Sequence, residues 1–524
     1  MIVFRSVCGR VVAELIWRRE QGWMTRSSFL TGVHPFSDGS VLVAGQNTGE
    51  LTLGQGDAAT TITGRSGQNG RRAWLARYDQ DGELIWAEPI AGNLLSSIAI
   101  TSDDSIIVTG RIAAHDAAGN DFEISRVFGA GTPRETRVPG CEPAFEVFRQ
   151  EETQREWAPE SYSYGVGGEP TCSIRFVAQF DGDGNFQWVR TAHSQYGGAS
   201  PIPTVLPDGS VVVRFTFGGV ALLEAGTPSE RDLLLPLEYL EQNVPFLVHY
   251  GPDGAIASVV QLCSPGEKLA VRPFSMDDGH IGLVGWRGMA SGTTARDKYI
   301  ESPPIFTISA LDADKNYVWE IEIELPPESF RGAGVPGEVD RFPNGDLLIT
   351  FGHRFRDDTG LYKHGEALHE TASNPITEEF EAARIQYALR VDQRGNIRWL
   401  IPTVQAQRDR GGAPVPDVLV MDDGSWLLYG SSKEGDTDFV VGPGQPNERH
   451  VEEGDDVIAR FYPDGRLDTL LESPELSDWF PSSRIRLPDG TFISAIEDWE
   501  VTPEVLTPVI TRIRLELMYE EEDE

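Results

Sequence analysis

The chain has 524 residues, of which 81 are acidic and 44 basic, so its formal net charge is −37. Such a surface repels phosphate backbones and anionic membranes, which argues against a nucleic-acid-binding protein. The 55 glycines and 34 prolines, in a chain that is 40% hydrophobic, indicate many short strands joined by turns around a sizeable core. No apolar run approaches the roughly 18 residues of a transmembrane helix, so none is predicted.

The N-terminal segment, MIVFRSVCGRVVAELIWRRE, lacks the apolar core of a signal peptide because Arg5 and Arg10 interrupt it. Its tetrapeptide ELIW at Glu14–Trp17 recurs at Glu83–Trp86, where it belongs to a repeated hairpin. At the other end, VITRIRLE at Val509–Glu516 resembles the third strand of a repeat and is followed by no turn. We therefore expect the N-terminal strand to complete the last repeat.

A strand–turn–strand unit with an Asp-Gly or related turn recurs seven times along the chain. Aspartate and glycine suit tight hairpins because these turns need a positive φ or a bond from a side chain to the backbone. The copies are FSDGSVLVAG from Phe36, TSDDSIIVTG from Thr101, LPDGSVVVRF from Leu206, MDDGHIGLVG from Met276, FPNGDLLITF from Phe342, MDDGSWLLYG from Met421 and LPDGTFISAI from Leu487.

A second hairpin alternates with the first and ends in tryptophan. Its copies include WLARYDQDGELIWAE from Trp74, FVAQFDGDGNFQWVR from Phe176, TISALDADKNYVWEI from Thr307 and YALRVDQRGNIRWLI from Tyr387. A large flat side chain on an outer strand can pack between neighbouring sheets, so we expect a structural role for these tryptophans. They are Trp86, Trp188, Trp319 and Trp399, with Ser258 and Thr469 at the matching positions of two other repeats.

Two hairpins in each of seven repeats predict an all-β fold, a seven-bladed β-propeller with four-stranded antiparallel blades. The last blade would be closed by the N-terminal strand. We expect one domain over residues 1–519, an insertion at about 111–174 within the second blade, and a disordered acidic tail at 520–524. One short helix is predicted at residues 374–384, NPITEEFEAAR, where Asn374 is the N-cap and Pro375 starts the first turn.

The repeats resemble the bacterial β-propeller repeat family of secreted or surface proteins found in myxobacteria-like organisms. Besides the hairpins, the matching pieces are FGAGTPRE at Phe128–Glu135, EAGTPSE at Glu224–Glu230 and VGPGQPNE at Val441–Glu448. This resemblance implies a propeller and export from the cytoplasm. The strand-plus-tryptophan pattern is also loosely similar to quinoprotein-type propellers, but no residues here map onto their cofactor ligands.

Candidate binding residues lie in the long connections between the second and third strands of a blade, where a rigid scaffold holds loops in place. The insertion carries Trp157, Tyr162 and Tyr164 beside Arg149 and Arg155. These aromatics either stack on a sugar ring or a peptide, or pack the insertion onto its blade. Inner-strand charges offer a second candidate, which either forms a channel site or pairs internally: Glu338, Asp340, Arg341, Asp417, Arg484 and Arg486.

Four cysteines are present, and none forms a CxxC pair, so zinc is not suggested. Cys141 and Cys172 lie near the ends of the insertion, where a disulfide would restrict the unfolded chain. Such a bridge would also indicate an oxidising compartment. The alternative is two free thiols.

No other motif predicts a metal or a cofactor. GAGVPG at Gly332–Gly337 has a proline inside and no helix after it, so it is no dinucleotide site. HGEALHE at His364–Glu370 lacks the HExxH spacing. The paired aspartates of the hairpins lack the acidic residue that closes a calcium loop.

The sequence therefore favours a monomeric, non-catalytic binding or scaffold module that recognises a glycan or a protein through the long-loop face. The family resemblance and the candidate disulfide favour an extracytoplasmic location, although no signal peptide is visible. The alternative is a propeller enzyme, such as a lyase, a hydrolase or a quinoprotein, with its site over the central channel.

Overall fold

The computed structural model divides the chain into two compact units. Unit 1 comprises Met1–Leu15, Glu267–Ser482 and Ile513–Glu524, and unit 2 comprises Ile16–Gly266 and Ser483–Arg512. The structure describes residues 2–5, 10–20, 24–25, 29–54, 59–64, 71–92, 94–112, 127–140, 173–196, 199–224, 230–233, 244–262, 269–287, 305–324, 336–355, 361–363, 366–369, 383–406, 417–431, 439–451, 456–473, 484–486, 492–502 and 505–518.

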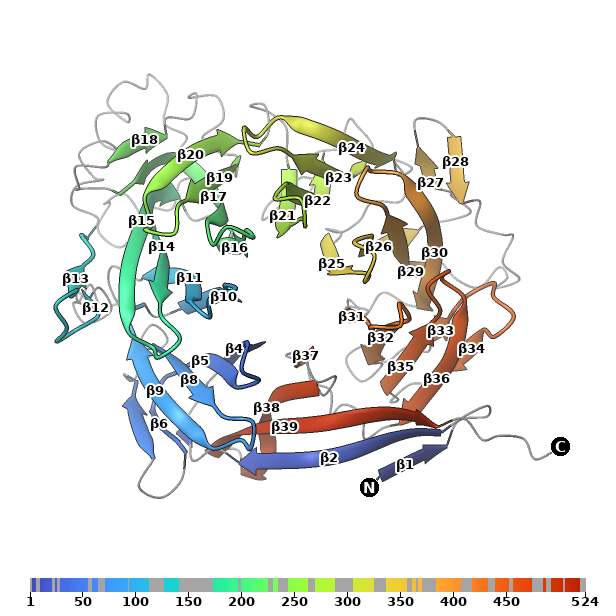
Figure 1. Ribbon diagram of the computed structural model, residues 1–524, viewed down its shortest axis with the longest axis horizontal. Helices are drawn as coiled ribbons and strands as arrows, with labels where there is room; N and C mark the ends of the chain where they lie inside the picture. Colours follow the sequence, from blue (N-terminus) through green and yellow to red (C-terminus); the bar gives the residue numbers. More distant parts are fainter. Residues whose placement is uncertain are drawn as a thin grey trace, which may run out of the picture. The chain divides into compact units, whose positions relative to one another are not determined.

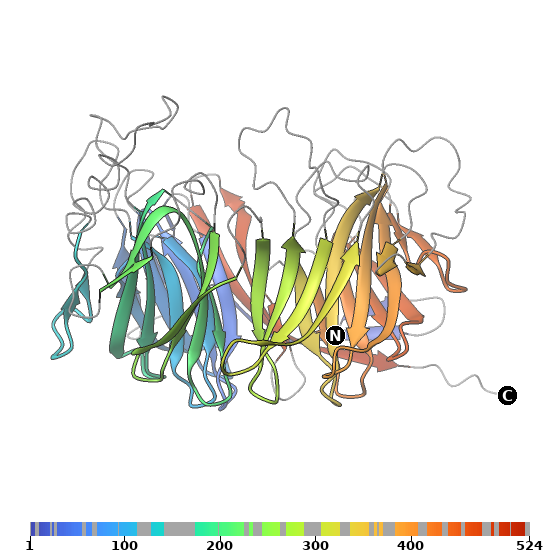
Figure 2. The same ribbon diagram turned by 90° about the horizontal axis from the view of Figure 1, so that it is seen from above.

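Unit 2 contains three successive four-stranded antiparallel meanders, which we call blades 1 to 3 (Figures 1 and 2). Blade 1 consists of β4 (Phe29–Pro35), β5 (Val41–Asn47), β8 (Arg72–Tyr78) and β9 (Leu84–Ile90). Blade 2 consists of β10 (Leu94–Ile100), β11 (Ile106–Ile112), β14 (Ser173–Phe180) and β15 (Phe186–Tyr196). Blade 3 consists of β16 (Ile202–Val205), β17 (Val211–Leu223), β19 (Val244–Tyr250) and β20 (Ile256–Gln261).

Unit 1 contains blades 4 to 6 in the same arrangement. Blade 4 consists of β21 (Leu269–Ser275), β22 (Ile281–Arg287), β23 (Ile305–Leu311) and β24 (Tyr317–Glu324). Blade 5 consists of β25 (Pro336–Arg341), β26 (Leu347–Phe355), β29 (Ala383–Val391) and β30 (Ile397–Ala406). Blade 6 consists of β31 (Asp417–Val420), β32 (Trp426–Ser431), β35 (Asp456–Phe461) and β36 (Leu467–Ser473).

The chain ends contribute further strands. β37 (Arg484–Arg486) pairs with β38 (Phe492–Thr502), β38 pairs with β39 (Val505–Met518), and β39 lies between β2 (Arg10–Glu20) and β3 (Met24–Thr25). β1 (Ile2–Arg5) pairs with β2. Short strands extend three of the blades: β18 (Arg231–Leu233) pairs with β17, β27 (Leu361–Lys363) and β28 (Glu366–His369) follow β24, and β33 (Phe439–Val441) and β34 (Arg449–Val451) follow β30. β6 (Glu50–Leu53) and β7 (Thr60–Thr63) continue the sheet of β39 beyond β3, and β12 (Val127–Phe128) and β13 (Thr136–Arg137) form a two-stranded sheet of their own.

The described residues form strands and turns and no helix, which confirms the all-β prediction for this part of the chain. Most of the helix predicted at residues 374–384 lies outside the described residues. Its last two residues, Ala383 and Arg384, belong to strand β29, so the predicted helix end is wrong. Ala383 pairs with Phe355, and tertiary pairing overrides the local helix preference there.

Middle strands of blades 1 and 2 are apolar on both faces. Every residue of β5 and of β14 is buried. Leu42 and Leu75 of blade 1 share one core cluster with Ile106 and Phe176 of blade 2. The core therefore lies between blades, and burial of such side chains stabilises the fold by roughly 1.5–3 kcal/mol each.

The predicted tight hairpins are present in all six blades. In blade 2, Asp181 N donates to Asn185 O at 2.9 Å and Gly184 N donates back to Asp181 O at 2.9 Å. The Asp181 carboxylate accepts the Asn185 N–H at 2.8 Å, which explains the aspartate at the first turn position. The fourth turn residue takes a positive φ, 82° at Gly184, as a bulged hairpin requires.

The outer-strand tryptophans bind the turn of the following blade. Trp86 Nε1 donates to Gly182 O at 3.2 Å, and Trp188 Nε1 donates to Pro252 O at 3.2 Å. In unit 1, Trp319 Nε1 donates to Gln393 O at 3.0 Å and Trp399 Nε1 donates to Pro463 O at 3.1 Å. These four side chains therefore join consecutive blades, which is the structural role expected from the sequence.

The tryptophan rings also explain the turn glycines beyond their backbone angle. A Cβ atom placed on Gly254 would lie 2.6 Å from Cδ2 of Trp188, whereas one placed on Gly209 would meet no atom within 4 Å. Both glycines occupy the same turn position, with φ values of 77° and 80°. They therefore form a matched pair that separates backbone strain from ring contact.

We predict that Gly209→Ala lowers the free energy of unfolding by about 1–2 kcal/mol, the cost of the left-handed conformation. Gly254→Ala should cost a further ~1–3 kcal/mol because its methyl group overlaps the Trp188 ring. In a Trp188→Ala background this extra cost should disappear, giving a coupling energy in the double-mutant cycle. Urea unfolding of the full-length chain measures all three values, and equal costs at the two glycines would contradict the role assigned to Trp188.

Candidate functional site

In blades 1 and 5, one register position in the outer hairpin holds an arginine that bridges turns. In blade 1 this residue is Arg77, directly opposite Trp86 across the strand pair. Its guanidinium donates from Nε to Ser40 Oγ, from Nη1 to Gly182 O and from Nη2 to Asp38 Oδ2, each at 2.8 Å. It thereby joins the inner turn of its own blade to the outer turn of blade 2.

Arg390 repeats this arrangement in blade 5. Its Nε donates to Asp346 Oδ2 at 2.8 Å, and its Nη1 donates to Pro463 O in blade 6 at 2.8 Å. The guanidinium lies over Phe342, 4.1 Å from the ring centroid, as that of Arg77 lies over Phe36 at 4.2 Å. Blade 6 places Arg460 at this position, bonded to Ser425 Oγ at 3.1 Å.

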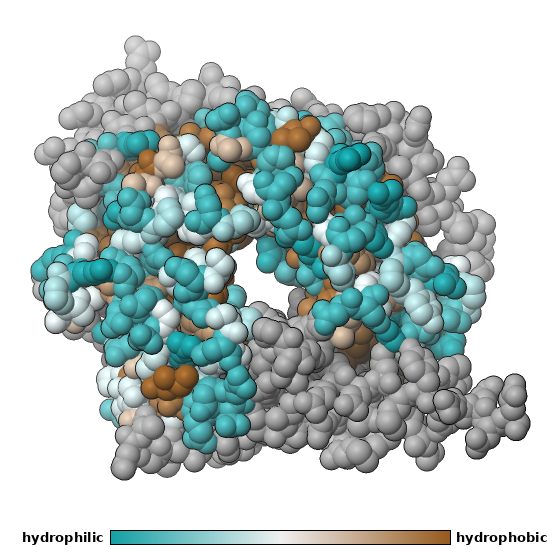
Figure 3. All heavy atoms as spheres, in the orientation of Figure 1, coloured by the Kyte–Doolittle hydropathy of each residue, from teal (hydrophilic) through white to brown (hydrophobic). Residues whose placement is uncertain are grey.

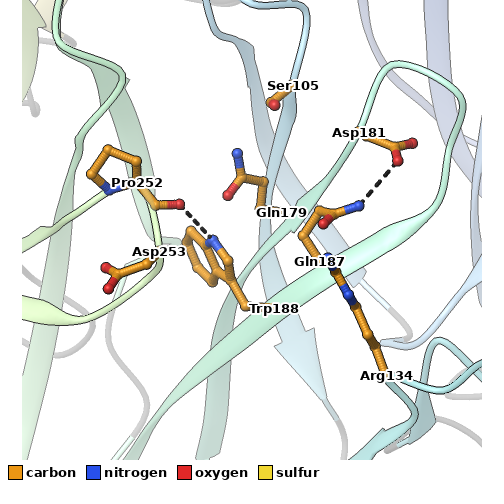
Figure 4. A pocket seen from close by; sticks show the side chains of 8 residues that line it. All are labelled: Ser105, Arg134, Gln179, Asp181, Gln187, Trp188, Pro252 and Asp253. Carbon is orange, nitrogen blue, oxygen red and sulfur yellow. Dashed lines mark hydrogen bonds between the residues drawn. The ribbon is translucent and has the colours of Figure 1, made fainter.

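Blade 2 has a glutamine, Gln179, at the same position, opposite Trp188. A hollow of 460 Å³ is present beside it (Figure 4). Its walls come from the β12–β13 hairpin, the turns of blade 2 and the outer turn of blade 3, all within unit 2. The lining residues are Ser105, Arg134, Gln179, Asp181, Gln187, Trp188, Pro252 and Asp253.

The floor of the hollow is buried and polar. Ser105 and Gln179 are each 9% exposed, and Trp188 is 8% exposed. Figure 4 shows the Gln179 amide inside the hollow, and no hydrogen-bond partner of its side chain occurs among the described residues.

The mouth of the hollow is charged. Asp253 and Arg134 are exposed on opposite sides of it, and the Gln187 amide donates to Asp181 Oδ2 at 3.0 Å (Figure 4). Behind Ser105, the Asp103 carboxylate accepts the hydroxyl of Thr101, and this bond lowers the pKa of Asp103. Two carboxylates, those of Asp181 and Asp253, and one guanidinium, that of Arg134, therefore line the site.

The sequence predicted a site elsewhere, on the long insertion. Arg149, Trp157, Tyr162 and Tyr164 lie outside the described residues, as do Cys141 and Cys172. The insertion does connect two paired strands of one blade, since β11 and β14 are in register from Ile106↔Phe180 to Ile112↔Ile174.

The inner-strand charges of β25 pair with neighbouring inner strands. Glu338 Oε1 accepts Arg272 Nη1 at 2.7 Å, and Arg341 bonds the Asp277 carboxylate and Ser275 O. Asp340 Oδ2 accepts the Val420 N–H at 2.6 Å. These residues join blades 4, 5 and 6, which matches the internal-pairing interpretation. Arg486 lies on β37, where it pairs with Phe492 in register.

Within the described ranges, no cluster of three or more His, Cys, Asp or Glu side chains is arranged to hold a metal ion.

No helix suited to crossing a membrane occurs in the part of the chain that the structure describes.

Gln179, Ser105, Asp253 and Arg134 were not predicted as site residues. Aligning the outer hairpins would have revealed part of the signal, because ARYDQDG, LRVDQRG and ARFYPDG place arginine where AQFDGDG places Gln179. The partners of that arginine lie in other turns and another blade. Only the folded structure therefore shows which hydrogen-bond acceptors lie near this position when glutamine stands in place of the arginine.

No family model matches this chain, and no curated protein matches it in sequence. The resemblance to bacterial β-propeller repeat proteins consequently has no family match behind it. Three solved structures are distant likenesses with TM-scores below 0.5, and they carry no information about a ligand or a reaction.

These three likenesses are as follows. Prolyl oligopeptidase B from Galerina marginata is 8% identical, with a TM-score of 0.34, over 89% of this chain and 46% of that protein. Virginiamycin B lyase from Staphylococcus aureus is 11% identical, with a TM-score of 0.26, over 87% of this chain and 99% of the lyase. The Dos1 propeller is 9% identical, with a TM-score of 0.31, over 78% of this chain and 92% of the Dos1 chain. This chain thus spans less than half of the oligopeptidase.

One carboxyl group in unit 2 has the raised pKa of a general acid, but its contacts are structural. Burial raises the pKa of Glu224 to about 7, while the Thr191 N–H and the nearby Arg190 oppose the shift. Its Oε1 accepts the Thr191 N–H at 2.9 Å, and its own N–H donates to Thr191 O at 2.9 Å. Glu224 therefore ties the end of β17 to β15.

We predict that Glu224 makes the protein less stable as the pH rises from about 4.5 to 7. Over this range the carboxyl group of Glu224 loses its proton in the unfolded chain and keeps it in the folded chain. The free energy of unfolding is therefore highest below the pKa of the unfolded chain, 4.5, and falls until the pH passes the pKa of the folded chain, about 7. A shift of this size corresponds to roughly 3 kcal/mol.

Urea unfolding at pH 5 and pH 8 measures the effect. Glu224→Gln should raise the stability at pH 8 and flatten the pH dependence, because the amide still accepts the Thr191 N–H. Glu88→Gln, an exposed glutamate of the same unit, is the control. An unchanged pH profile in Glu224→Gln would contradict the assignment.

Proposed function

We propose that this chain is a seven-bladed β-propeller that acts as a non-catalytic binding module for a polypeptide partner. Six blades are followed along the chain by β37, β38 and β39, and the sheet order β37–β38–β39–β2 supports a seventh blade completed by the N-terminal strand. Closure of a propeller in this way removes exposed sheet edges.

One observation carries the binding assignment: the amide of Gln179, a residue that is 9% exposed, is directed into a polar hollow (Figure 4). The hollow is lined by carboxylates, amides, a serine, an arginine and a tryptophan, which suit hydrogen bonding to a polar group. No imidazole lines it among the described residues to activate Ser105. A binding role therefore fits the site better than acyl transfer does.

Surface charge favours a polypeptide partner. The chain carries a formal net charge of −37, which would attract basic segments and speed their association. Figure 3 shows the described surface in that view as mostly hydrophilic, with scattered hydrophobic residues. Polar and charged contacts would therefore dominate recognition, and the aromatic residues of the insertion would add to them.

Binding to defined arrays tests this proposal. The labelled full-length chain is applied to an array of synthetic peptides of mixed charge and to a glycan array. The Gln179→Arg variant fills the hollow with the residue that blades 1, 5 and 6 already use. Ile85→Arg is the matched control, since it adds the same charge at a side chain that is 51% exposed.

We expect peptide signals that the Ile85→Arg variant retains and the Gln179→Arg variant loses. Signals confined to glycans would overturn the polypeptide assignment. Signals equal in both variants, or none at all, would overturn the binding role of the hollow.

We also propose that the protein matures outside the reducing cytosol, with one disulfide between Cys141 and Cys172. A bridge near the ends of the insertion would stabilise the fold by roughly 3–4 kcal/mol through its effect on the unfolded chain. Mass spectrometry after alkylation of the unreduced protein should detect two free thiols, those of Cys8 and Cys263. Four alkylated thiols would contradict both the bridge and the location.

A further inference from the structure

The hollow beside Gln179 retains the acceptors that hold a guanidinium in blade 1. Arg77 bonds Ser40 Oγ, Asp38 Oδ2 and Gly182 O. At the matching positions of the inner turn and of the next outer turn, blade 2 has Ser105, Asp103 and the carbonyl of Pro252. Trp188 Nε1 donates to Pro252 O as Trp86 Nε1 donates to Gly182 O.

The outer-turn carbonyl has room for a second hydrogen bond. Gly182 O accepts two donors, Trp86 Nε1 at 3.2 Å and Arg77 Nη1 at 2.8 Å. Pro463 O likewise accepts Trp399 Nε1 and Arg390 Nη1. Among the described residues, Pro252 O accepts Trp188 Nε1 alone, although a carbonyl oxygen has two lone pairs.

Two substitutions within the repeat leave the guanidinium position open. Gln179 is shorter than arginine and carries no charge. Thr101 stands where blade 1 has Phe36, the ring that lies under the Arg77 guanidinium at 4.2 Å. The Thr101 hydroxyl bonds the Asp103 carboxylate and Ser105 O instead. Together the smaller side chains account for a hollow of 460 Å³ at this place.

We infer that the hollow binds the guanidinium group of an arginine side chain from a polypeptide partner, in the place that Arg77 fills in blade 1. This inference rests on the proposed function and names the group that the module recognises. The planar guanidinium suits acceptors arranged on several sides, which a compact ammonium cannot reach together. Pro252 O, Ser105 Oγ and the carboxylate of Asp103 or Asp253 are the expected acceptors.

The Gln179 amide and Arg134 complete the site. The amide oxygen of Gln179 accepts a guanidinium N–H, so the buried side chain gains the partner that it lacks among the described residues. Arg134, exposed at the mouth, donates to a backbone carbonyl or a carboxylate of the peptide beside the arginine. The site therefore selects an arginine followed or preceded by an acceptor group.

Isothermal titration calorimetry with the full-length chain tests the inference. The probes are the peptide Gly-Gly-Arg-Gly-Gly, its citrulline and lysine analogues, and arginine amide. Citrulline keeps the length and shape of arginine but replaces one nitrogen by oxygen and removes the charge. Loss of a charge-assisted hydrogen bond should weaken binding by about tenfold or more.

We expect the arginine peptide to bind at least about tenfold more tightly than the citrulline peptide, and the lysine peptide to fall between them. Equal affinities for arginine and citrulline would overturn the inference. If arginine amide binds as tightly as the pentapeptide, the ligand is a small guanidinium compound, and the polypeptide part of the inference is wrong.

Two variants that add the same positive charge distinguish binding in the hollow from a general effect of charge on affinity. Gln179→Arg should abolish binding of the arginine peptide and raise the melting temperature, because its own guanidinium reaches the vacant acceptors. Ile85→Arg should leave the affinity unchanged within about twofold. Persistent binding by a folded Gln179→Arg variant would overturn the inference.

Arg77→Gln creates the same vacancy in blade 1. It should lower the melting temperature, and millimolar arginine amide should restore part of the loss, while citrulline amide should not. Failure of this rescue would count against the inference, because arginine amide offers the same guanidinium to the same acceptors. The proposed function would fail differently, by giving no Gln179-dependent peptide signal on the array.

Discussion

The structure depends on one constraint: each four-stranded sheet has two apolar faces and can be stable only when other sheets cover both. β5 and β14 are buried along their whole length, so the middle of a blade has no solvent-facing side. Hydrophobic area removed from water between blades is the main favourable contribution. A single blade alone would expose one such face or both, which is why the repeats have to occur in series.

Hydrophobic faces alone would allow neighbouring sheets to slide, and polar contacts at the turns fix their alignment. Each outer-strand tryptophan combines a flat apolar ring with one N–H donor, so it packs on a turn glycine and bonds a turn carbonyl at the same time. Arg77 adds one further bond across the junction of blades 1 and 2, and Arg390 adds one across the junction of blades 5 and 6. Two constraints therefore favour glycine at this turn position: its backbone has a positive φ, and the tryptophan ring leaves no room for a Cβ atom.

The candidate site follows from a departure from this repeated junction. Where Arg77 fills the junction of blades 1 and 2, Gln179 leaves that of blades 2 and 3 partly open. Carbonyl and carboxylate acceptors remain, because the turns themselves require them. A site of this kind needs no added loop, since the scaffold supplies every group except the missing cation.

Much of the fold was predictable from the sequence alone, because strand alternation and turn chemistry are local. The Asp-Gly hairpins, the alternation of two hairpins and the structural role of Trp188 follow from residues close together in the chain. Gln179 could be noticed in the sequence but not interpreted. Its meaning depends on Ser105, which strand pairing within blade 2 brings near it, and on Pro252, which meets it only when blades 2 and 3 pack. Local patterns determine which strands and turns form, whereas the hollow and its unsatisfied acceptors arise from contacts between residues far apart in sequence, which only the tertiary structure brings together.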